Sequence, residues 1–280
     1  MILSCPNCKS LLSHFEHSLK CSAGHSFDQA KAGYFNLLLP NQKKTIDPGD
    51  SKEMIKSRES FLSNGHYDFL IEKLNALLKI NHTSNEMNLL DIGCGSGYYT
   101  RALFSETRNI QKTGLDISKN SIEVASKKDK DSVYIVASAF NLPITNASVD
   151  FIINVFSPIA LNEADRVLNE NGKIYKVIPG PYHMREIAEL VYDNFKPHHA
   201  NFEEEVNSGN QFVIYDQISI SKNLEMDKNS VQEMIAMTPY RYKFKDEQFN
   251  KLTYMNVTVS FQIMILQKTG YSQNEVGNNR

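Results

Sequence analysis

Residues 87–100, "MNLLDIGCGSGYYT", give the clearest indication of the fold of this chain of 280 residues. Its apolar first part, Met87 to Ile92, is typical of a buried strand, and three glycines at alternate positions follow directly. Glycines have no Cβ, so the backbone can turn tightly and approach a ligand closely. A buried strand, a glycine turn and a helix start together predict a nucleotide-cofactor site.

The residues downstream have to support this interpretation, because a glycine pattern alone is weak. We predict a second strand in "QKTGLDIS" (111–118), and further strands in 132–143, 148–158 and 172–181. Helical patterns at 118–128 and 159–170 lie between them. Strands that alternate with helices predict an α/β fold with a Rossmann-like, doubly wound and mostly parallel sheet. Asp116 ends the second strand, where a carboxylate can accept hydrogen bonds from both ribose hydroxyls of an adenosine moiety.

The glycine spacing indicates the kind of cofactor. A dinucleotide fingerprint needs a third glycine three positions after the second, and Tyr98 stands there instead. The G-x-G-x-G pattern, with "LDIGCGSG" before it and "ASAFNLP" (137–143) after it, resembles class I S-adenosylmethionine-dependent methyltransferases. In that family an acidic residue often precedes the adenine-flanking pair, and Ser138 stands there here. The alternative is a sheet of this type that has lost its cofactor. The resemblance implies cofactor contacts at Asp91, Gly93, Gly95, Ser96, Gly97, Tyr98, Asp116 (ribose), Ile117, Ala139 and Phe140 (adenine).

A second pattern, C-x2-C-x12-C-x3-H, is formed by Cys5, Cys8, Cys21 and His25. Four sulfur or nitrogen donors at this spacing are typical of tetrahedral structural zinc, and the twelve-residue gap suits a hairpin. Four protein ligands leave no open position for water, so we expect a structural zinc ion rather than a catalytic one. His14 and His17 are weaker candidates for the fourth ligand. The alternative is that the cysteines are buried and metal-free.

Composition and charge are those of an ordinary soluble globular chain, with 41% hydrophobic residues and a net charge of −2. Residues 1–60 hold eight basic and six acidic side chains, so any RNA contact there must concentrate basic groups on one face. No secretory signal is apparent, and the longest apolar run, "VTVSFQIMIL" (257–266), is too short to span a bilayer. We expect a cytoplasmic protein without a membrane partner, whose clustered cysteines bind metal rather than form disulfides.

The order of motifs is similar to that of the bacterial family of 23S rRNA guanine-N1 methyltransferases. The knuckle is followed by "FDQAKAGYFNLL" (27–38), "DPGDSKEM" (47–54), "FLSNGHYDFL" (61–70), "LDIGCGSGYYT" (90–100), "PGPYHMREI" (179–187) and "MTPY" (237–240). The resemblance runs from Cys5 to about Tyr254, and the ordered set is far more specific than any single motif. It implies zinc at the knuckle, further cofactor contacts at Tyr67 and His183, and a homodimer that grips RNA. Tyr67 is equally well interpreted as a tyrosine that caps the core.

The resemblance implies methyl transfer to N1 of a specific guanine in a 23S rRNA hairpin near the peptide exit tunnel. We expect three parts: a zinc-binding knuckle for RNA recognition (1–36), a linker with helices (37–84) and the methyltransferase domain (85–280). Stripping the zinc should therefore weaken RNA binding before cofactor binding. Two alternatives are a methyltransferase of a small molecule and a zinc-dependent nucleic-acid-binding regulator.

The target pocket is expected at the end of the fourth strand, in "NVFSP" (154–158), with Asn154, Phe156, Ser157 and the aromatic Tyr240 as candidates. Ordinary strand-end packing and a helix stop at Thr238-Pro239 are the alternatives. "DPGD" (47–50) is interpreted as a turn, with Asp50 or Ser51 as the cap of the next helix, in preference to a contact with RNA through the preceding Lys43 and Lys44. No catalytic base is assigned, and residues 200–226 show no recognisable motif.

Overall fold

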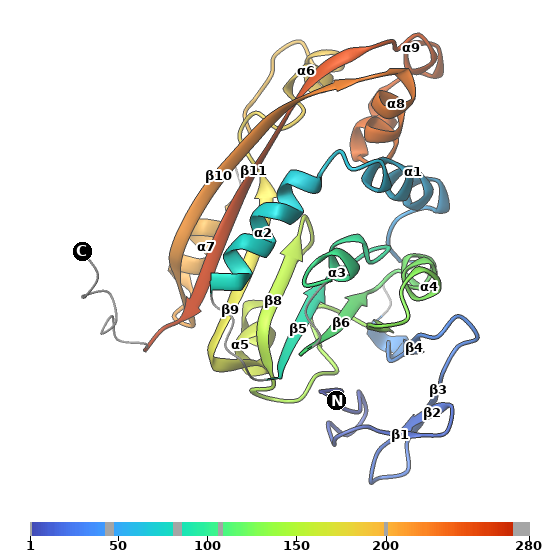
Figure 1. The fold of residues 1–280 in the computed structure, drawn as a ribbon, viewed down its shortest axis with the longest axis vertical. Coiled ribbons are helices and arrows are strands. Elements are labelled where there is room, and N and C mark those ends of the chain that lie inside the picture. Colours follow the sequence, from blue (N-terminus) through green and yellow to red (C-terminus); the bar gives the residue numbers. More distant parts are fainter. Residues whose placement is uncertain (1, 43–47, 81–85, 106–108, 199–200, 271–280) are drawn as a thin grey trace.

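The computed structural model describes residues 2–42, 48–80, 86–105, 109–198 and 201–270. An eight-stranded sheet has the order β10-β11-β9-β8-β5-β6-β7-β4, and a separate sheet has the order β1-β2-β3 (Figure 1). The strands of the large sheet are β4 (Phe35–Asn36), β5 (Met87–Ile92), β6 (Ile110–Asp116), β7 (Val133–Val136), β8 (Val149–Val155), β9 (Leu168–Pro179), β10 (Phe212–Met226) and β11 (Met255–Lys268).

The centre of the large sheet is parallel, as the sequence predicts. β5 pairs with β6 on one side and with β8 on the other, and all three run in the same direction. β7 is shorter than the predicted strand 132–143, because the chain leaves the sheet after Val136. Ser138 ends the strand locally: its carbonyl accepts from Asn141 N at 3.2 Å, and its hydroxyl accepts from Phe140 N at 3.2 Å. Residues 138–145 are therefore a loop, not a strand.

Helices cover both faces of the sheet, and the buried apolar residues fall into clusters accordingly. α1 to α4 lie over one face, and α5 and α7 over the other, where the amino-terminal sheet also packs. The predicted cap of the first helix is confirmed, since the Ser51 hydroxyl accepts from Met54 N at 3.2 Å. Asp47, Lys43 and Lys44 lie outside the described residues.

The helices are α1 (Lys52–Ser63), α2 (Asp68–Ile80), α3 (Tyr98–Ala102), α4 (Lys119–Lys128), α5 (Leu161–Val167), α6 (Arg185–Glu189), α7 (Phe202–Ser208), α8 (Lys228–Ala236) and α9 (Asp246–Asn250), with 3-10 turns η1 (Pro40–Gln42) and η2 (Pro239–Lys243).

A long C-terminal hairpin is the part of the fold that the sequence did not predict. β11 joins the sheet by pairing antiparallel with β9 over Phe261–Gln267, and β10 pairs with β11 along its whole length. The hairpin therefore rises beyond the parallel strands, and α6, α8, η2 and α9 gather around its far end (Figure 1). We call this assembly the cap. In the described part of the chain, no helix is long and apolar enough to cross a membrane.

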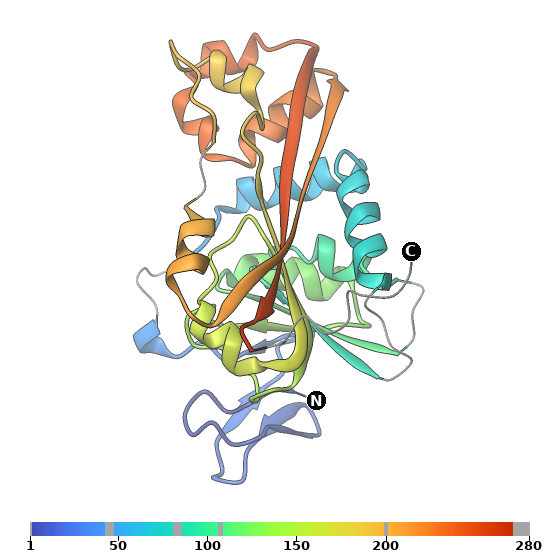
Figure 2. The ribbon, with the colours of Figure 1, turned by 90° about the vertical axis from the view of Figure 1, so that its left-hand side faces the viewer.

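The amino-terminal sheet lies at the opposite end of the molecule from the cap (Figure 2). β1 (Ser13–Phe15), β2 (Ser18–Lys20) and β3 (Ser26–Asp28) form it, and we call residues 3–36 the ribbon. Its apolar residues Leu3, Leu12 and Leu19 are continuous with the core of the large sheet. β4 continues the chain into that sheet by pairing with β7.

Candidate active site

A cavity of about 790 Å³ lies at the carboxyl ends of the parallel strands. The strand order reverses there, because the chain runs from β5 to β6 and β7 on one side and then returns to β8. Open α/β sheets bind their ligands at such a reversal. The glycine loop, α1, the loops after β6 to β9, and the turn between α8 and η2 form its walls.

The glycine loop between β5 and α3 forms the floor of the cavity. Gly93, Gly95 and Gly97 all have positive φ (74°, 55° and 75°), which side chains rarely tolerate. A Cβ on Gly93 would lie 2.1 Å from Ser157 Oγ, and one on Gly97 would lie 2.6 Å from Tyr134 Oη. A Cβ on Gly95 would have no atom within 4 Å. Two glycines are therefore required for packing, whereas Gly95 leaves open space in the cavity wall for a ligand.

Asp116 lies beside this open space, at the end of β6. Its two carboxylate oxygens accept one hydrogen bond each, from Gly95 N at 2.9 Å and Ser118 N at 2.8 Å. Burial raises the pKa of the carboxyl above its ordinary value, while these N–H donors act in the opposite direction. Each oxygen keeps a second lone pair, so the carboxylate can still accept from two hydroxyls. Ile117 also lines the cavity.

The loop after β7 places Ser138, Ala139 and Phe140 along another wall. The Phe140 ring is 66% exposed, which is unusual for a large apolar side chain and leaves its face free to cover a flat ligand. This loop is tied to the ribbon: Ser4 N donates to Pro143 O at 2.9 Å, and Thr145 N donates to Ile2 O at 2.8 Å.

Tyr67 lines the same cavity from the turn directly before α2, and His183 lines it from the loop after β9. Tyr67 is 2% exposed, and its hydroxyl has no hydrogen-bond partner among the described residues. A buried hydroxyl without a partner is costly, and a bound polar ligand would relieve that cost. Burial lowers the pKa of His183 to about 3. Its Nδ1 accepts from Ser260 N at 3.3 Å, so the neutral ring carries its proton on Nε2 and can act as a donor there.

Three of the predicted site residues lie behind the cavity wall. Asp91 is buried, accepts from Thr100 Oγ1 at 2.6 Å and has its pKa raised to about 7 by burial. Gly97 packs against Tyr134, as described above. Asn154 is fully buried and donates through Nδ2 to Ile92 O at 2.8 Å and Ser157 Oγ at 2.6 Å. These three residues therefore contact neighbouring parts of the chain, and they support the glycine loop and residues 156–158 from behind.

The other expected residues line the cavity: Gly93, Gly95, Ser96, Tyr98, Phe156, Ser157 and Tyr240. Phe156 has φ +54°, which is unfavourable for a residue with a side chain, and its ring is 42% exposed. It lies 5.9 Å from the ring of His183 and 5.5 Å from that of Phe261, measured between centroids. Tyr240 enters the cavity from η2 in the cap.

Sequence reasoning missed Lys176, which lines the cavity from β9 although it is only 6% exposed. Its ammonium donates to Asn154 Oδ1 and Ser157 O, and burial lowers its pKa to about 8. The sequence does contain a signal for this residue, because Lys176 interrupts the apolar strand "KIYKVIP" (173–179) and lysine is rarely buried without a specific role. Sequence reasoning also missed Arg58, whose ion pair with Asp50 borders the cavity and whose Nη2 donates to Met237 O at 3.0 Å.

The four expected zinc ligands converge at the edge of the ribbon. The ligand atoms of Cys5, Cys8, Cys21 and His25 all lie within 4.8 Å of one another. Cys8 Sγ and Cys21 Sγ are 3.6 Å apart, and His25 Nδ1 is 3.5 Å from Cys5 Sγ and 3.4 Å from Cys21 Sγ. A tetrahedral zinc ion with ordinary bond lengths places such neighbours about 3.6–3.8 Å apart, so the donor set and its size fit zinc. Gly24, with φ +86°, supplies the bend before His25.

Two family models match separate parts of the chain. The model described as "RlmA, N-terminal", a zinc ribbon, matches residues 3–46, and the model described as "Methyltransferase domain" matches residues 90–176. Together they place a zinc ribbon and a methyltransferase sheet in the order that the fold shows.

Three curated relatives match most of the chain. The 23S rRNA (guanine(748)-N(1))-methyltransferase of Streptomyces fradiae is 26% identical over 85% of this chain and 84% of its own length. YxjB of Bacillus subtilis, described as a candidate 23S rRNA (guanine-N(1)-)-methyltransferase, is 26% identical over 94% of this chain and 96% of its own length. A Micromonospora griseorubida protein with the same description is 30% identical over 68% of this chain and 69% of its own length. All three alignments extend well beyond either family model.

Proposed function

The chain belongs to the family of 23S rRNA (guanine-N1-)-methyltransferases, and on that premise we propose that it methylates N1 of one guanine in a 23S rRNA hairpin near the peptide exit tunnel. It is an S-adenosylmethionine-dependent rRNA methyltransferase with a structural zinc ion in its ribbon. Relatives that align along most of the chain favour this function over a small-molecule methyltransferase or a zinc-dependent regulator.

We propose that the open space over Gly95 receives the cofactor, and this observation carries the assignment of the site. When bound, S-adenosylmethionine supplies an electrophilic methyl group on a sulfonium. Asp116 would accept hydrogen bonds from the ribose hydroxyls through its two remaining lone pairs. Ala139 and Phe140 would cover the adenine, and the buried Tyr67 hydroxyl would gain the partner that it lacks within the described chain.

The target guanine would lie against Phe156, Ser157 and Tyr240. Lys176 holds this wall, because it donates to Ser157 O and to Asn154, which itself anchors the segment to β5 through Ile92 O. Stacking of a base on an exposed ring contributes about 1–3 kcal/mol, so Phe156 would orient the base for attack. His183 would serve as a hydrogen-bond donor rather than as a base, since its Nδ1 lone pair is occupied by Ser260 N–H. N1 is hidden in a base pair, so the guanine must be unpaired or flipped out.

Mass spectrometry of 23S rRNA from cells with and without the gene tests this function. Loss of a single N1-methylguanosine in the deletion strain is the expected result, and an unchanged modification profile would contradict the proposal. Complementation with Gly95→Val should fail to restore the methyl group, because the side chain would occupy the cofactor space. The zinc content of the purified variant should equal that of the wild type, which separates a cofactor defect from misfolding of the ribbon.

The finer organisation follows from the same premise. We propose that residues 1–36 contribute to RNA recognition and that residues 85–280 form the methyltransferase domain. Residues 37–84 would link these two parts and pack on the methyltransferase domain. We also propose that the enzyme is cytoplasmic, where ribosomal RNA is made, and acts as a homodimer. Light scattering coupled to gel filtration checks the dimer, which a monomeric mass with and without RNA would contradict.

A further inference from the structure

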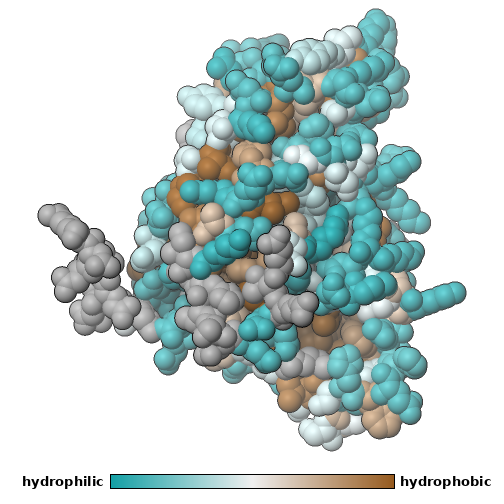
Figure 3. All heavy atoms as spheres, in the orientation of Figure 1, coloured by the Kyte–Doolittle hydropathy of each residue, from teal (hydrophilic) through white to brown (hydrophobic). Residues whose placement is uncertain are grey.

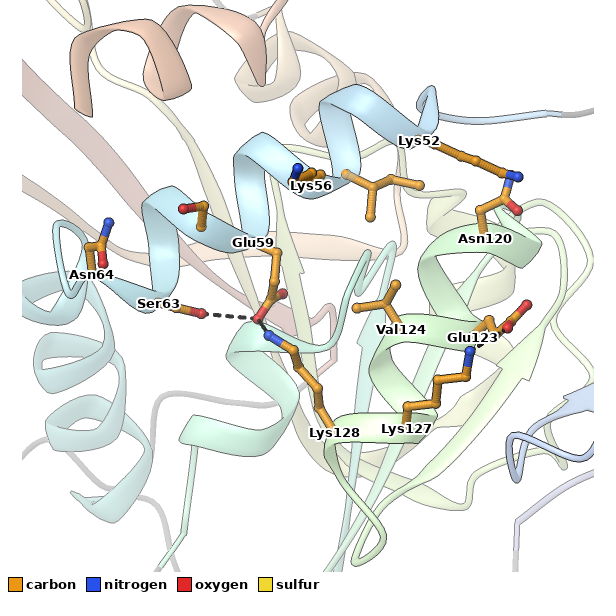
Figure 4. A pocket seen from close by; sticks show the side chains of 12 residues that line it. Lys52, Lys56, Glu59, Ser63, Asn64, Asn120, Glu123, Val124, Lys127 and Lys128 are labelled. Carbon is orange, nitrogen blue, oxygen red and sulfur yellow. Dashed lines mark hydrogen bonds and ion pairs between the residues drawn. The ribbon is translucent and has the colours of Figure 1, made fainter. Parts of the chain in front are cut away.

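A second hollow, of about 640 Å³, lies between α1 and α4 and does not share a lining residue with the cofactor cavity. Lys52 and Lys56 enter it from α1, and Lys127 and Lys128 enter it from α4 (Figure 4). We call it the lysine groove. The surface over α4 is largely hydrophilic in the space-filling view (Figure 3). Arg58 and Leu62 of the same helix line the cofactor cavity, so α1 forms part of the wall of both hollows.

The groove carries a positive charge although the whole chain carries −2. Its lining has four lysines and only two carboxylates, Glu59 and Glu123. Glu123 pairs with Lys127 at 2.6 Å. Glu59 is buried in the floor, where it is bound by Lys128 and by Arg101 at 2.6 Å. Both acidic groups are therefore already neutralised by neighbours.

Lys52 and Lys56 are less compensated, although Lys52 lies near enough to Glu123 to help lower the pKa of that carboxyl. Both are exposed, they stand one helical turn apart on the same face, and neither forms an ion pair with a carboxylate in the described ranges. Like charges four residues apart on a helix repel each other, and an anion bound between them removes that repulsion.

The remaining lining suits an extended polyanion better than a single phosphate. Asn64 supplies a neutral amide donor in the groove, which phosphate oxygens and sugar hydroxyls can use, whereas the Ser60 hydroxyl already donates to Glu233 Oε1 at 2.6 Å. Exposed, flexible ammonium groups bind phosphodiesters through counterion release rather than through one enclosed pocket. Because Glu59 also accepts from Ser96 Oγ in the glycine loop, the floor of the groove is joined directly to the cofactor site.

We propose that the lysine groove binds the phosphodiester backbone of the RNA substrate. This inference rests on the proposed function, and it adds a binding surface distinct from the target pocket. RNA in the groove would position a neighbouring nucleotide of the same strand over α1, toward the cofactor cavity. Lys52 and Lys56 would contact phosphates and contribute affinity without sequence preference.

The test compares two double variants with equal loss of charge. K52Q/K56Q removes both groove lysines, whereas K73Q/K79Q removes two lysines of α2 that lie outside the groove. Glu59, Lys128 and Arg101 are left intact, so the link to the glycine loop is preserved. The probe is an unmodified 23S rRNA transcript, with dissociation constants measured by filter binding over a range of KCl concentrations.

We expect K52Q/K56Q to raise the dissociation constant about tenfold and to reduce the slope of log K against log salt by about 1–2, while K73Q/K79Q changes neither. Cofactor affinity by calorimetry should stay unchanged in both variants, and K52R/K56R should retain binding because the charge remains. If the wild type methylates the transcript and K52Q/K56Q binds and methylates it equally well, the groove proposal is overturned and the proposed function stands. If the wild type neither binds nor methylates the transcript, both are overturned.

Discussion

The ribbon at one end of the molecule and the β10–β11 hairpin at the other are both antiparallel β structures, yet different interactions stabilise them. The ribbon has three strands of three residues each, and β1 is exposed at every position. β10 and β11 have 15 and 14 residues, and β11 contributes Val257, Val259, Phe261, Ile263 and Ile265 to one large core cluster. Strands as short as those of the ribbon cannot bury enough apolar surface, so the ribbon depends on its metal.

Both regions nevertheless contact the cavity that we propose for the cofactor, from opposite sides. Ser4 of the ribbon and Ile2, which precedes it, bond to the loop that carries Ala139 and Phe140. The hairpin bonds to the loop that carries His183: Gly180 N donates to Ser260 O at 2.7 Å, and Met184 N donates to Thr258 O at 2.8 Å. A region stabilised by metal and a region stabilised by packing thus fix two walls of one site.

The largest effect is expected from breaking the ribbon with Cys21→Ser. Structural zinc contributes on the order of 10–16 kcal/mol to the folding of small zinc modules, so the ribbon should unfold and zinc should be lost. The 138–145 loop then loses its anchors, and cofactor affinity should fall about tenfold together with RNA affinity. Zinc analysis and calorimetry with the cofactor measure both. His14→Ala is the control, because His14 lies outside the ligand cluster.

This outcome differs from the expectation that zinc removal weakens RNA binding first. Full cofactor affinity in the zinc-free protein would mean that the ribbon is an independent RNA-binding module. The contacts between the ribbon and the adenine-side loop would then have no influence on the site.

A smaller effect is expected from the hairpin side. Phe261 is fully buried and lies 5.0 Å from the ring of Tyr67 and 5.1 Å from that of His183. Phe261→Ala should lower the free energy of unfolding by about 3–5 kcal/mol, since a large cavity would remain. Phe15→Ala in the ribbon is the matched control and should change it by about 0.5 kcal/mol, because Phe15 is half exposed. Denaturant unfolding gives both values, and similar losses in the two variants would refute the contrast between the regions.

The smallest effect concerns Lys176, which lies in the sheet between the two regions. Its pKa is about 8 in the folded protein and 10.5 in the ordinary case, so between these pH values the unfolded chain binds more protons. The wild type should therefore gain about 3 kcal/mol of stability relative to Lys176→Met as the pH rises from 8 to 10.5, and no further difference should develop below pH 8. Urea unfolding at a series of pH values checks this, and parallel stability curves for the two proteins would contradict the lowered pKa of Lys176.

Much of the sheet could be predicted because its signals are local. The run Met87 to Ile92, the glycines after it and the Asp at 116 each act within a few residues, and β5 and β6 stand where the apolar runs predicted them, whereas β9 begins at Leu168, inside the predicted helix 159–170. The spacing of Cys5, Cys8, Cys21 and His25 likewise predicted a cluster that the fold forms. The early end of β7 could not be predicted, because an apolar run does not reveal where Ser138 turns the chain.

Short-range periodicity and metal-ligand spacing encode the parallel sheet, the glycine turn and the zinc ligands, so these features could be predicted without a structure. The pairing of residues 212–226 with residues 255–268 is visible only in the folded molecule, because α8 and α9 lie between the two segments and no sequence motif links them. The fold also places Lys176 against Ser157 in the cavity wall and sets Lys52 and Lys56 beside α4 in a shared groove. Long-range contacts of this kind depend on how completed elements pack, and no window of sequence contains both partners.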